Sequence, residues 1–380
     1  MPELVKCFHC GTIAPIADMY ERYNHPNYRQ SFPVEELYHC EDCLSEIKKC
    51  DFCHSEFHSS QLLGNDNLAC PECRENLIIC SECEELVQED ETEEFIDGRV
   101  CQNCAQDIRN NLTYLHPYNF KPEPNFHSLP KELCQPYYGI ELEIDRTEED
   151  YTSHIDNHAE EIHDQSNGSD LCDYEKYVYI KKDSSLKHGI ELVTHPCTYD
   201  YHIQKMGWKY ILDECDTKGY SSHDIGTCGL HIHISRSAFG TRPGEEEMNI
   251  AKLLLFFETN WNNIVKFSRR TQTSITEYCD RYGIKEGERP QQLLEKAKQS
   301  GRFFAVNLKN EKTVEIRIFR GTLKLETFTA CLQFTHLITE LVSNMKVQEV
   351  LDLTWTDLIN VASEKDYSEF VDYSISKNLK

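Results

Sequence analysis

The chain has 380 residues and a formal charge of −26, from 65 Asp and Glu against 39 Lys and Arg. At about 100–200 residues per domain, that length predicts two or three domains. The acidic balance excludes a chain built to wrap nucleic acid, which needs clustered Lys and Arg to neutralise phosphates. No apolar run reaches the roughly 20 residues that cross a membrane, and a signal-peptide pattern is missing from the first residues. We therefore expect a cytoplasmic protein without membrane or nucleic-acid partners.

Cysteines in the first third of the chain occur as six Cys-x-x-Cys pairs. These pairs hold 12 of the 19 cysteines, and in an intracellular chain this spacing indicates metal binding and not disulfides. Two thiolates three residues apart reach one ion across a tight turn, and two such turns complete a closed tetrahedral zinc site. Pairing successive turns predicts three structural Zn²⁺ ions, held by Cys7, Cys10, Cys40 and Cys43, by Cys50, Cys53, Cys70 and Cys73, and by Cys80, Cys83, Cys101 and Cys104.

The three sites define three tandem zinc ribbons, over residues 1–46, 47–77 and 78–110. Short segments that resemble one another, such as Lys48-Lys49-Cys50 and Ile78-Ile79-Cys80, open the units and indicate an internal repeat. Two alternatives stay open. One is a cross-braced pairing, as in RING-type modules; the other replaces a cysteine with a histidine, for which the candidates are His9, His39, His54 and His58.

The charge of this region bears on what the ribbons bind. Residues 1–104 hold 7 Lys and Arg against 22 Asp and Glu, a net charge of −15. Such a surface repels a phosphate backbone. We therefore expect the ribbons to recognise a protein or to dock onto the neighbouring domain.

Residues 111–136 are rich in proline and aromatic side chains. Pro117, Pro122 and Pro124 forbid a helix. The aromatic residues predict that this linker lies extended against a surface.

Four predicted strands in residues 137–380 alternate apolar and polar side chains. They cover residues 139–145, 189–193, 229–235 and 313–318, with polar faces that carry Glu141 and Glu143, Glu191, His231 and His233, and Glu315 and Arg317. An antiparallel sheet with one solvated face is the plain alternative. However, carboxylates with imidazole suit divalent cations, and an added arginine suits phosphate or carboxylate. If the faces converge on a curved sheet, they form a nucleotide–metal site.

Helical periodicity separates these strands. We predict helices over residues 201–216, 245–270, 291–299 and 326–344, two short helices after Thr356 and Ser368, and a surface helix within the acidic stretch 146–176. The fold class is therefore α+β, with helices behind a mainly antiparallel sheet.

The motifs along this region resemble those of the amidoligase family, carboxylate–amine ligases with a glutamine-synthetase-like fold. In chain order they are Gly139-Ile140-Glu141-Leu142-Glu143, Lys181-Lys182-Asp183-Ser184-Ser185-Leu186, Cys228-Gly229-Leu230-His231-Ile232-His233 and Glu315-Ile316-Arg317-Ile318-Phe319-Arg320-Gly321. The resemblance covers about residues 116–345. The linker, Arg269-Arg270 and residues 303–308 resemble the phage-encoded branch, for which the location is the host cytoplasm. Ser184 departs from the glycine that is usual in the second motif.

The resemblance implies a curved sheet, a catalytic domain over residues 137–380, and a role for each motif residue. Magnesium ligands would be Glu141, Glu143, Glu191, His231 and Glu315, with Asp183 adding to the shell and His233 as the alternative histidine. Arg317 and Arg320 would face the phosphates, and Arg269 and Asn307 would lie on the same rim.

The activity implied is an ATP-dependent ligation with two Mg²⁺ ions. A carboxylate attacks the γ-phosphate to give an acyl phosphate, and an amine then displaces phosphate to form an amide. The substrate is expected to be a peptide or protein recruited by the zinc ribbons. Two alternatives are a guanidino-type phosphotransferase on the same fold and a non-enzymatic zinc-ribbon protein that binds a host protein.

Overall fold

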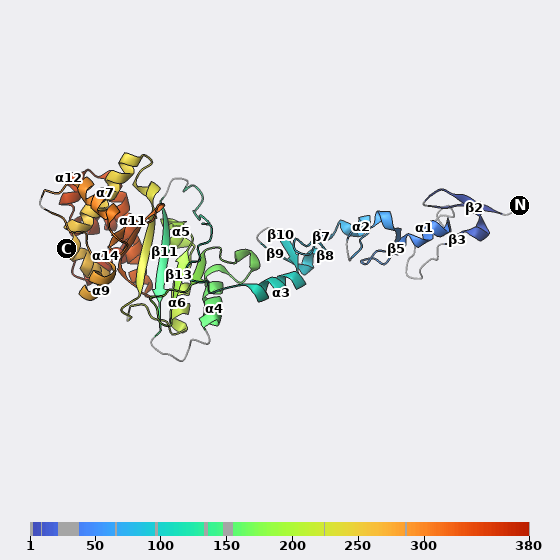
Figure 1. Ribbon diagram of the computed structural model, residues 1–380, viewed down its shortest axis with the longest axis horizontal. Helices are drawn as coiled ribbons and strands as arrows, with labels where there is room; N and C mark the ends of the chain where they lie inside the picture. The colour runs from blue at the N-terminus through green and yellow to red at the C-terminus, as the bar shows by residue number, and fades with distance from the viewer. Residues whose placement is uncertain are drawn as a thin grey trace. The chain divides into compact units, whose positions relative to one another are not determined.

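The computed structural model describes residues 3–8, 10–21, 38–64, 67–95, 98–132, 136–146, 155–223, 225–285 and 287–379. These residues form two compact units, Met1–Leu112 and Thr113–Lys380. In Figure 1 the colour follows residue number, so the first unit is blue to cyan and the second is green to red.

The first unit repeats one small motif three times. Its elements are β1 (Leu4–Lys6), β2 (Ile13–Pro15), β3 (Tyr20–Glu21), β4 (Tyr38–His39), α1 (Glu41–Ser45), β5 (Ile47–Lys49), β6 (Glu56–His58), α2 (Pro71–Arg74), β7 (Leu77–Ile79), β8 (Leu86–Gln88), β9 (Thr92–Phe95), β10 (Gly98–Cys101) and α3 (Gln102–Asn111). The first cysteine pair of each repeat lies in a two-stranded antiparallel hairpin. In each hairpin the residue after the second cysteine has a positive φ: 75° at Gly11, 59° at His54 and 61° at Glu84. The shared conformation supports the predicted repeat.

The second cysteine pair of each repeat differs from the predicted tight turn. Cys40, Cys70 and Cys101 are the N-cap residues of α1, α2 and α3. The first turn of a helix has backbone N–H groups without intrahelical partners. Two of these N–H groups have thiol partners. The Cys73 N–H donates to Cys70 Sγ at 3.4 Å, and the Cys104 N–H donates to Cys101 Sγ at 3.5 Å.

The proline-rich segment, which we call the strap (residues 113–132), contains no helix in the structure, as predicted. It belongs to the second unit. At His116 the strap backbone bonds to Ile180 O and Lys182 N, and at His127 it bonds to Pro196 O and Thr198 N. The strap therefore extends the sheet beside its edge strand and does not simply span two domains.

A seven-stranded antiparallel sheet forms the centre of the second unit. The strand order is β12 (Val178–Lys181), β13 (Ile190–Thr194), β11 (Tyr137–Ile144), β15 (Gly229–Ser235), β17 (Thr313–Arg320) and β16 (Val306–Asn307), and β14 (Cys197–Thr198) also pairs with β11. The four predicted strands are all present, and β15 has the predicted bounds. The register of β15 with β17 shifts between Leu230 and Ile232, which pair with Phe319 and Ile316, so β17 has one extra residue at this bulge.

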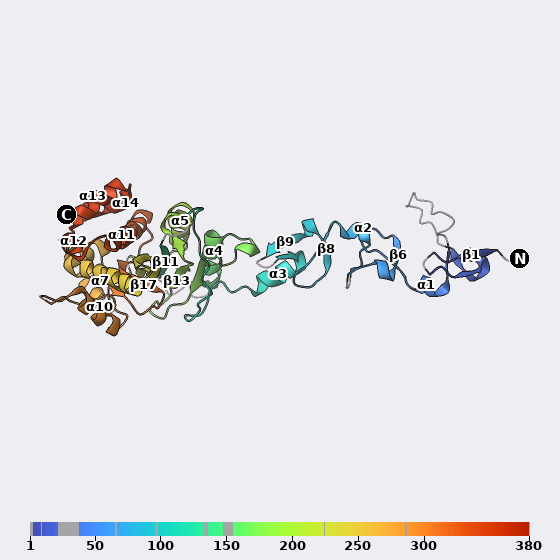
Figure 2. The same ribbon diagram turned by 90° about the horizontal axis from the view of Figure 1, so that it is seen from above.

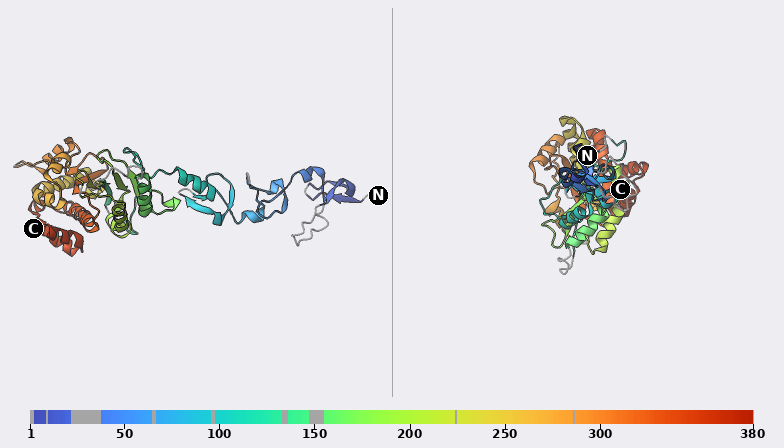
Figure 3. Two further views of the ribbon diagram at one scale, coloured as in Figure 1. Left: turned by 90° about the horizontal axis from the view of Figure 1, so that it is seen from below. Right: turned by 90° about the vertical axis from the view of Figure 1, so that its right-hand side faces the viewer.

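Helices cover the apolar face of this sheet. They are α4 (Ile155–Asn167), α5 (Tyr199–Gln204), α6 (Trp208–Thr217), α7 (Pro243–Thr259), α8 (Trp261–Ser268), α9 (Gln272–Tyr278), α10 (Pro290–Gln299), α11 (Leu325–Asn344), α12 (Val347–Asp352), α13 (Trp355–Glu364) and α14 (Ser368–Ser376). Figures 2 and 3 show the last two, in red, lying together near the C-terminus. No helix among the described residues is long and apolar enough to cross a membrane.

Two of the predicted helices are each divided in the structure. The helix expected over 201–216 is divided, because α5 ends at Gln204 and Gly207, with a φ of 61°, is the N-cap residue of α6. The helix expected over 245–270 breaks at Asn260, whose side chain donates to the Leu353 carbonyl at 3.3 Å. The stretch 146–176 contains α4, which is a surface helix as predicted: Ala159, Ile162 and His163 are buried on one face, and Glu160 and Glu161 are exposed on the other.

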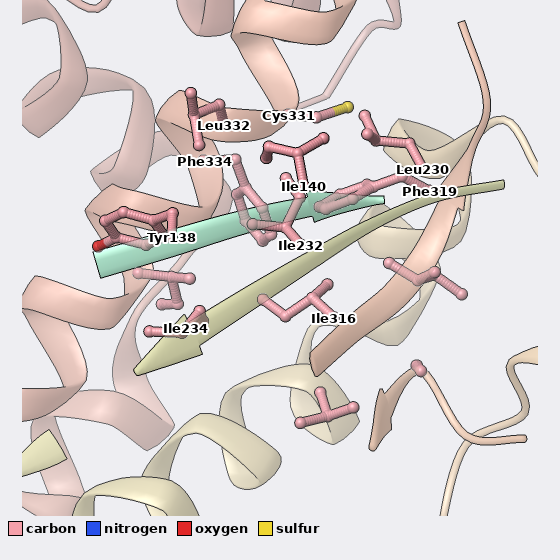
Figure 4. Close-up of a cluster of buried hydrophobic side chains, with 14 of the residues drawn as sticks. Tyr138, Ile140, Leu230, Ile232, Ile234, Ile316, Phe319, Cys331, Leu332 and Phe334 are labelled. Atoms are coloured by element: carbon pink, nitrogen blue, oxygen red, sulfur yellow. The ribbon is translucent and has the colours of Figure 1, made fainter. Parts of the chain in front are cut away.

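The core lies between the sheet and α11. Ile140, Ile232 and Ile316 point from three neighbouring strands towards the helices, where Leu332 and Phe334 meet them (Figure 4). All five side chains are almost fully buried. Because side chains alternate along a strand, this packing turns the predicted glutamates and histidines to the opposite face.

Candidate functional site

Twelve thiols of the first unit gather into three groups of four. Each group unites two successive Cys-x-x-Cys pairs, and its sulfur atoms lie within 4.8 Å of one another. The predicted sequential pairing is therefore confirmed, and the cross-braced alternative is wrong for these pairs. His39 and His54 are in none of the groups. His9 and the side chain of His58 lie outside the described residues.

The chemistry of the thiol groups fits zinc. Hydrogen bonding to Thr12 lowers the pKa of Cys10 to about 6, whereas burial and the neighbouring thiols raise the pKa of Cys43. Four thiolates cannot coexist at this distance without a cation. A four-thiolate site suits Zn²⁺ and is closed, so it supplies structure and no open position for chemistry. The three groups are thus compatible with zinc ribbons.

In the second unit, the sheet register places the predicted site residues in one row on the polar face. Glu143 is opposite Glu191, Glu141 is opposite His231, and Glu315 is opposite both His233 and Asn307. Lys181, on the edge strand, is opposite Glu191. The row therefore spans β12 to β16, with the carboxylates in its middle.

Five of these side chains form two groups that could hold a metal ion. One group contains Glu141, His231 and Glu315, and the other contains Glu143, Glu191 and His231. Candidate ligand atoms lie within 4.8 Å of one another in each group. Together the groups comprise all five residues predicted to bind magnesium. Carboxylate and imidazole ligands fit divalent cations of this kind.

His231 belongs to both groups. Its Nδ1 is 3.3 Å from Glu141 Oε2 and 3.8 Å from Glu315 Oε1. The other ring nitrogen lies beside Gly229, where a Cβ atom would be 2.6 Å from His231 Nε2 and 3.2 Å from Glu143 Oε2. Only glycine leaves this space open, and the Gly229 N–H also donates to Glu143 Oε2 at 2.5 Å.

His233 is not in either group. Its Nδ1 is 3.0 Å from Thr313 Oγ1, and its Nε2 is 3.2 Å from Glu141 Oε1. Although burial lowers the pKa of His233, the charges of Glu141 and Glu315 raise it to about 9. Of the two candidate histidines, the geometry therefore favours His231 as the ligand and makes His233 a partner of Glu141.

The neighbours of the carboxylates shift their pKa values in different directions. Burial and the charge of Glu141 raise the pKa of Glu191 to about 8, despite the nearby Lys181. Burial also opposes ionisation of Glu315, but His233 and Arg317 outweigh it and lower the pKa of that carboxyl. Asn307 and Asn310 donate to Glu315 Oε2 at 2.7 and 3.4 Å.

These groups line a cavity of about 510 Å³. Asp183 lies on its wall, and its Oδ1 accepts a hydrogen bond from the Ser185 N–H at 2.6 Å. Ser184 has no positive φ, so the turn forms without the usual glycine. The cationic side chains of the wall are Lys121, Lys181, Arg270, Arg302, Lys309 and Arg317. The cavity thus combines a carboxylate–histidine group with basic walls.

Two predicted arginines lie elsewhere. Arg269 ends α8 with a φ of 63°, and its guanidinium donates to the carbonyls of Arg320 and Gly321 at 2.8 and 3.3 Å. Arg269 and Arg320 are not among the described residues that line the cavity, whereas the neighbouring Arg270 is, and it is 7% exposed. The adjacent pair Arg269-Arg270 predicted an arginine at this site, but only the backbone conformation shows which of the two guanidinium groups faces the carboxylates.

Lys181 and the strap residues Tyr118, Asn119 and Lys121 also line the cavity, although no site role was predicted for them. Lys181 could have been found, because it occupies a polar-face position in the second motif. The strap carried no such signal.

Neither a family model nor a curated protein matches the chain. Among solved structures, the chain is similar to a bifunctional glutathione synthetase from Pasteurella multocida, with 10% identity and a TM-score of 0.37, over 64% of this chain and 46% of that one. It is also similar to the complex between the prokaryotic ubiquitin-like protein Pup and its ligase PafA, with 9% identity and a TM-score of 0.31, over 63% and 62%. The chain therefore spans less than two thirds of both. These likenesses are too distant to assign a function, which has to come from the site itself.

Proposed function

We propose that the chain is an ATP-dependent carboxylate–amine ligase that forms an amide through an acyl phosphate. The observation that carries this proposal is the pair of carboxylate–histidine groups sharing His231 in a cavity with basic walls. Divalent cations beside arginines are the usual means of holding transferring phosphates. The order of the four motifs, which resembles the amidoligase family, supports the same conclusion.

Two Mg²⁺ ions fit the residues present. Glu141 and Glu315 would hold one ion and Glu143 and Glu191 the other, and His231, with one free lone pair as a neutral imidazole, would complete one of the two sites. Bound there, the ions would neutralise the phosphates and the charge that develops during transfer. Asp183 lies nearby, but its Oδ1 is already bonded to the Ser185 N–H.

The protein's own groups have positioning roles. The guanidinium of Arg317 is paired with Glu315 and faces the cavity, where Arg270 adds a second positive charge. Asn307 holds Glu315, and His233 holds Glu141, so two ligand carboxylates are fixed by neighbours that do not join the groups. Phosphoryl transfer depends mostly on such positioning and electrostatics, and it requires no nucleophilic side chain.

The reaction has two balanced steps. A substrate carboxylate oxygen forms a bond to the γ-phosphorus of ATP, and the bond to ADP breaks. An amine nitrogen then attacks the acyl carbon, phosphate leaves, and the amine loses a proton. We further propose that the substrate is a peptide or protein recruited by the zinc-binding unit, because that unit is strongly acidic and its closed thiol groups have no chemistry of their own.

Calorimetry with Mg²⁺ and a non-hydrolysable ATP analogue tests nucleotide binding. We expect saturable heat with the wild-type chain and none with Glu143→Gln or Glu315→Gln. Glu295→Gln is the matched control, because this exposed glutamate lies on α10 outside the cavity. A wild-type chain that binds no Mg²⁺–nucleotide contradicts the proposal.

Mass spectrometry of the product distinguishes the chemistry. With ATP, Mg²⁺ and hydroxylamine as the amine, a candidate peptide should gain the mass of a hydroxamate. A gain of one phosphate, with no joining, would instead identify a phosphotransferase.

A further inference from the structure

Lys181 forms an ion pair with a carboxylate of one candidate metal group. Its Nζ is 2.9 Å from Glu191 Oε2, and the two side chains are 10% and 4% exposed. The sheet register causes this contact, since Lys181 and Glu191 are cross-strand neighbours on the polar face of β12 and β13. A lysine thus lies where it contacts a ligand of the group Glu143, Glu191 and His231.

The strap fixes the backbone at Lys181. The His116 N–H donates to Ile180 O at 2.9 Å, and the Lys182 N–H donates to His116 O at 2.9 Å. Lys181 Nζ also lies 5.8 Å from the ring centroid of Tyr118, which is in the strap. The Tyr118 hydroxyl accepts a hydrogen bond from Arg302 Nη1 at 3.4 Å. Lys181 is therefore held between the strap and Glu191.

Other basic side chains of the cavity differ from Lys181. Lys121, Arg302 and Lys309 are exposed. Arg317 pairs with Glu315, which belongs to the other group. Among the ion pairs of the described residues, Lys181–Glu191 is the one in which a lysine contacts a carboxylate of either group.

We propose that Lys181 competes with the divalent cation at Glu143, Glu191 and His231, and so sets the affinity of that site. The inference rests on the proposed function, in that the group holds a divalent cation. A cation that binds Glu191 has to displace a buried ion pair and come close to a positive charge. The displaced ammonium stays in the cavity, where its charge is available to a phosphate. Lys181 is thus a positioning residue that couples cation entry to the strap.

A Mn²⁺ titration followed by the electron paramagnetic resonance of the free ion tests this inference on the full-length, zinc-loaded chain at pH 8.5. The wild type should show two classes of Mn²⁺ site. Lys181→Met should tighten one class by about tenfold, which corresponds to the loss of one charge-assisted contact, and should leave the other within about twofold. Lys181→Arg should behave as the wild type, because it keeps the charge.

Two further variants make the test specific. Lys182→Met removes the same charge from an exposed neighbour and should change neither class. In a Glu191→Gln background, Lys181→Met should lose its effect, because the carboxylate for which lysine and cation compete is gone. Thermal unfolding followed by circular dichroism verifies that each variant is folded.

The outcomes separate the two proposals. If the wild type binds no Mn²⁺ at these groups, both the proposed function and this inference fail. If two classes are present and Lys181→Met leaves both unchanged or weakens them, the role of Lys181 is wrong and the proposed function stands.

Discussion

The two units build their candidate metal sites in opposite ways. In the first unit, each group of four thiols comes from two short pairs on neighbouring turns, such as Cys50 to Cys73. In the second unit, the candidate ligands run from Glu141 to Glu315 and meet because four strands align in register. The thiol groups hold small units together, whereas a large core holds the carboxylate–histidine groups. Metal should therefore be needed for folding in the first unit and for chemistry in the second.

Loss of one thiol ligand should have the largest effect. Cys70→Ser opens the middle group, and structural zinc contributes about 10–16 kcal/mol of folding free energy in small zinc domains. We expect bound zinc to fall from three to two per chain and proteolysis to cut within residues 47–77. All three tryptophans, Trp208, Trp261 and Trp355, lie in the second unit, so their fluorescence should report an unchanged melting temperature.

Cys172→Ser is the matched control, because Cys172 is in none of the thiol groups and should leave three zinc ions bound. If tryptophan fluorescence instead reports a lower melting temperature for Cys70→Ser, the two units do not fold independently.

The two histidines of β15 should differ in their effects. His231→Ala removes a ligand shared by both groups and should weaken Mn²⁺ binding by at least about 100-fold. His233→Ala removes only a partner of Glu141, for which about tenfold is expected. Equilibrium dialysis measures both. Equal losses would mean that the geometry does not identify the ligand.

A methyl group at Gly229 should disturb the site without removing a ligand. In Gly229→Ala the Cβ atom would lie 2.6 Å from His231 Nε2, so we expect about 1–3 kcal/mol of lost stability and weaker Mn²⁺ binding. Gly226→Ala is the control, since nothing lies within 4 Å of its added carbon. Urea unfolding followed by tryptophan fluorescence compares the two. Similar stabilities would contradict the close packing at Gly229.

The smallest predicted effect is an acid sensitivity of the second unit. Burial lowers the pKa of His202 to about 4, and its Nε2 lies 2.9 Å from Tyr138 O. A lowered folded-state pKa stabilises the fold above the unfolded pKa of about 6.5, and this stability is lost as pH falls. Protonation of His202 in the unfolded chain should therefore lower the free energy of unfolding by about 1 kcal/mol between pH 7 and 5.5. Urea unfolding at the two pH values should show a smaller difference in His202→Gln, and an unchanged difference would contradict this assignment.

The two units also differ in how much of their candidate metal sites could be predicted from the sequence. The thiol groups could be paired from sequence, because ligands three residues apart fix the turn that joins them. The strand β15 was predicted with its correct bounds, because His231 and His233 alternate strictly with buried residues. The five residues of the two carboxylate–histidine groups were predicted from this alternation and from family resemblance together.

Other features depended on long-range contacts that no local pattern reveals. The helix breaks at Gly207 and Asn260 interrupt continuous periodicity, and the second break uses a carbonyl from Leu353. The choice between Arg269 and Arg270 follows from one left-handed residue at the end of α8. The strap joins the cavity only because His116 pairs with the edge strand β12.

A count of bound metals tests the central contrast most directly. After dialysis against Mn²⁺ with a non-hydrolysable ATP analogue, metal analysis should give three Zn²⁺ and two Mn²⁺ per wild-type chain. In His231→Ala it should give three Zn²⁺ and at most one Mn²⁺. A wild type without Mn²⁺, or a variant that keeps both Mn²⁺ ions, would contradict the account of the second unit as a divalent-cation site for ligation.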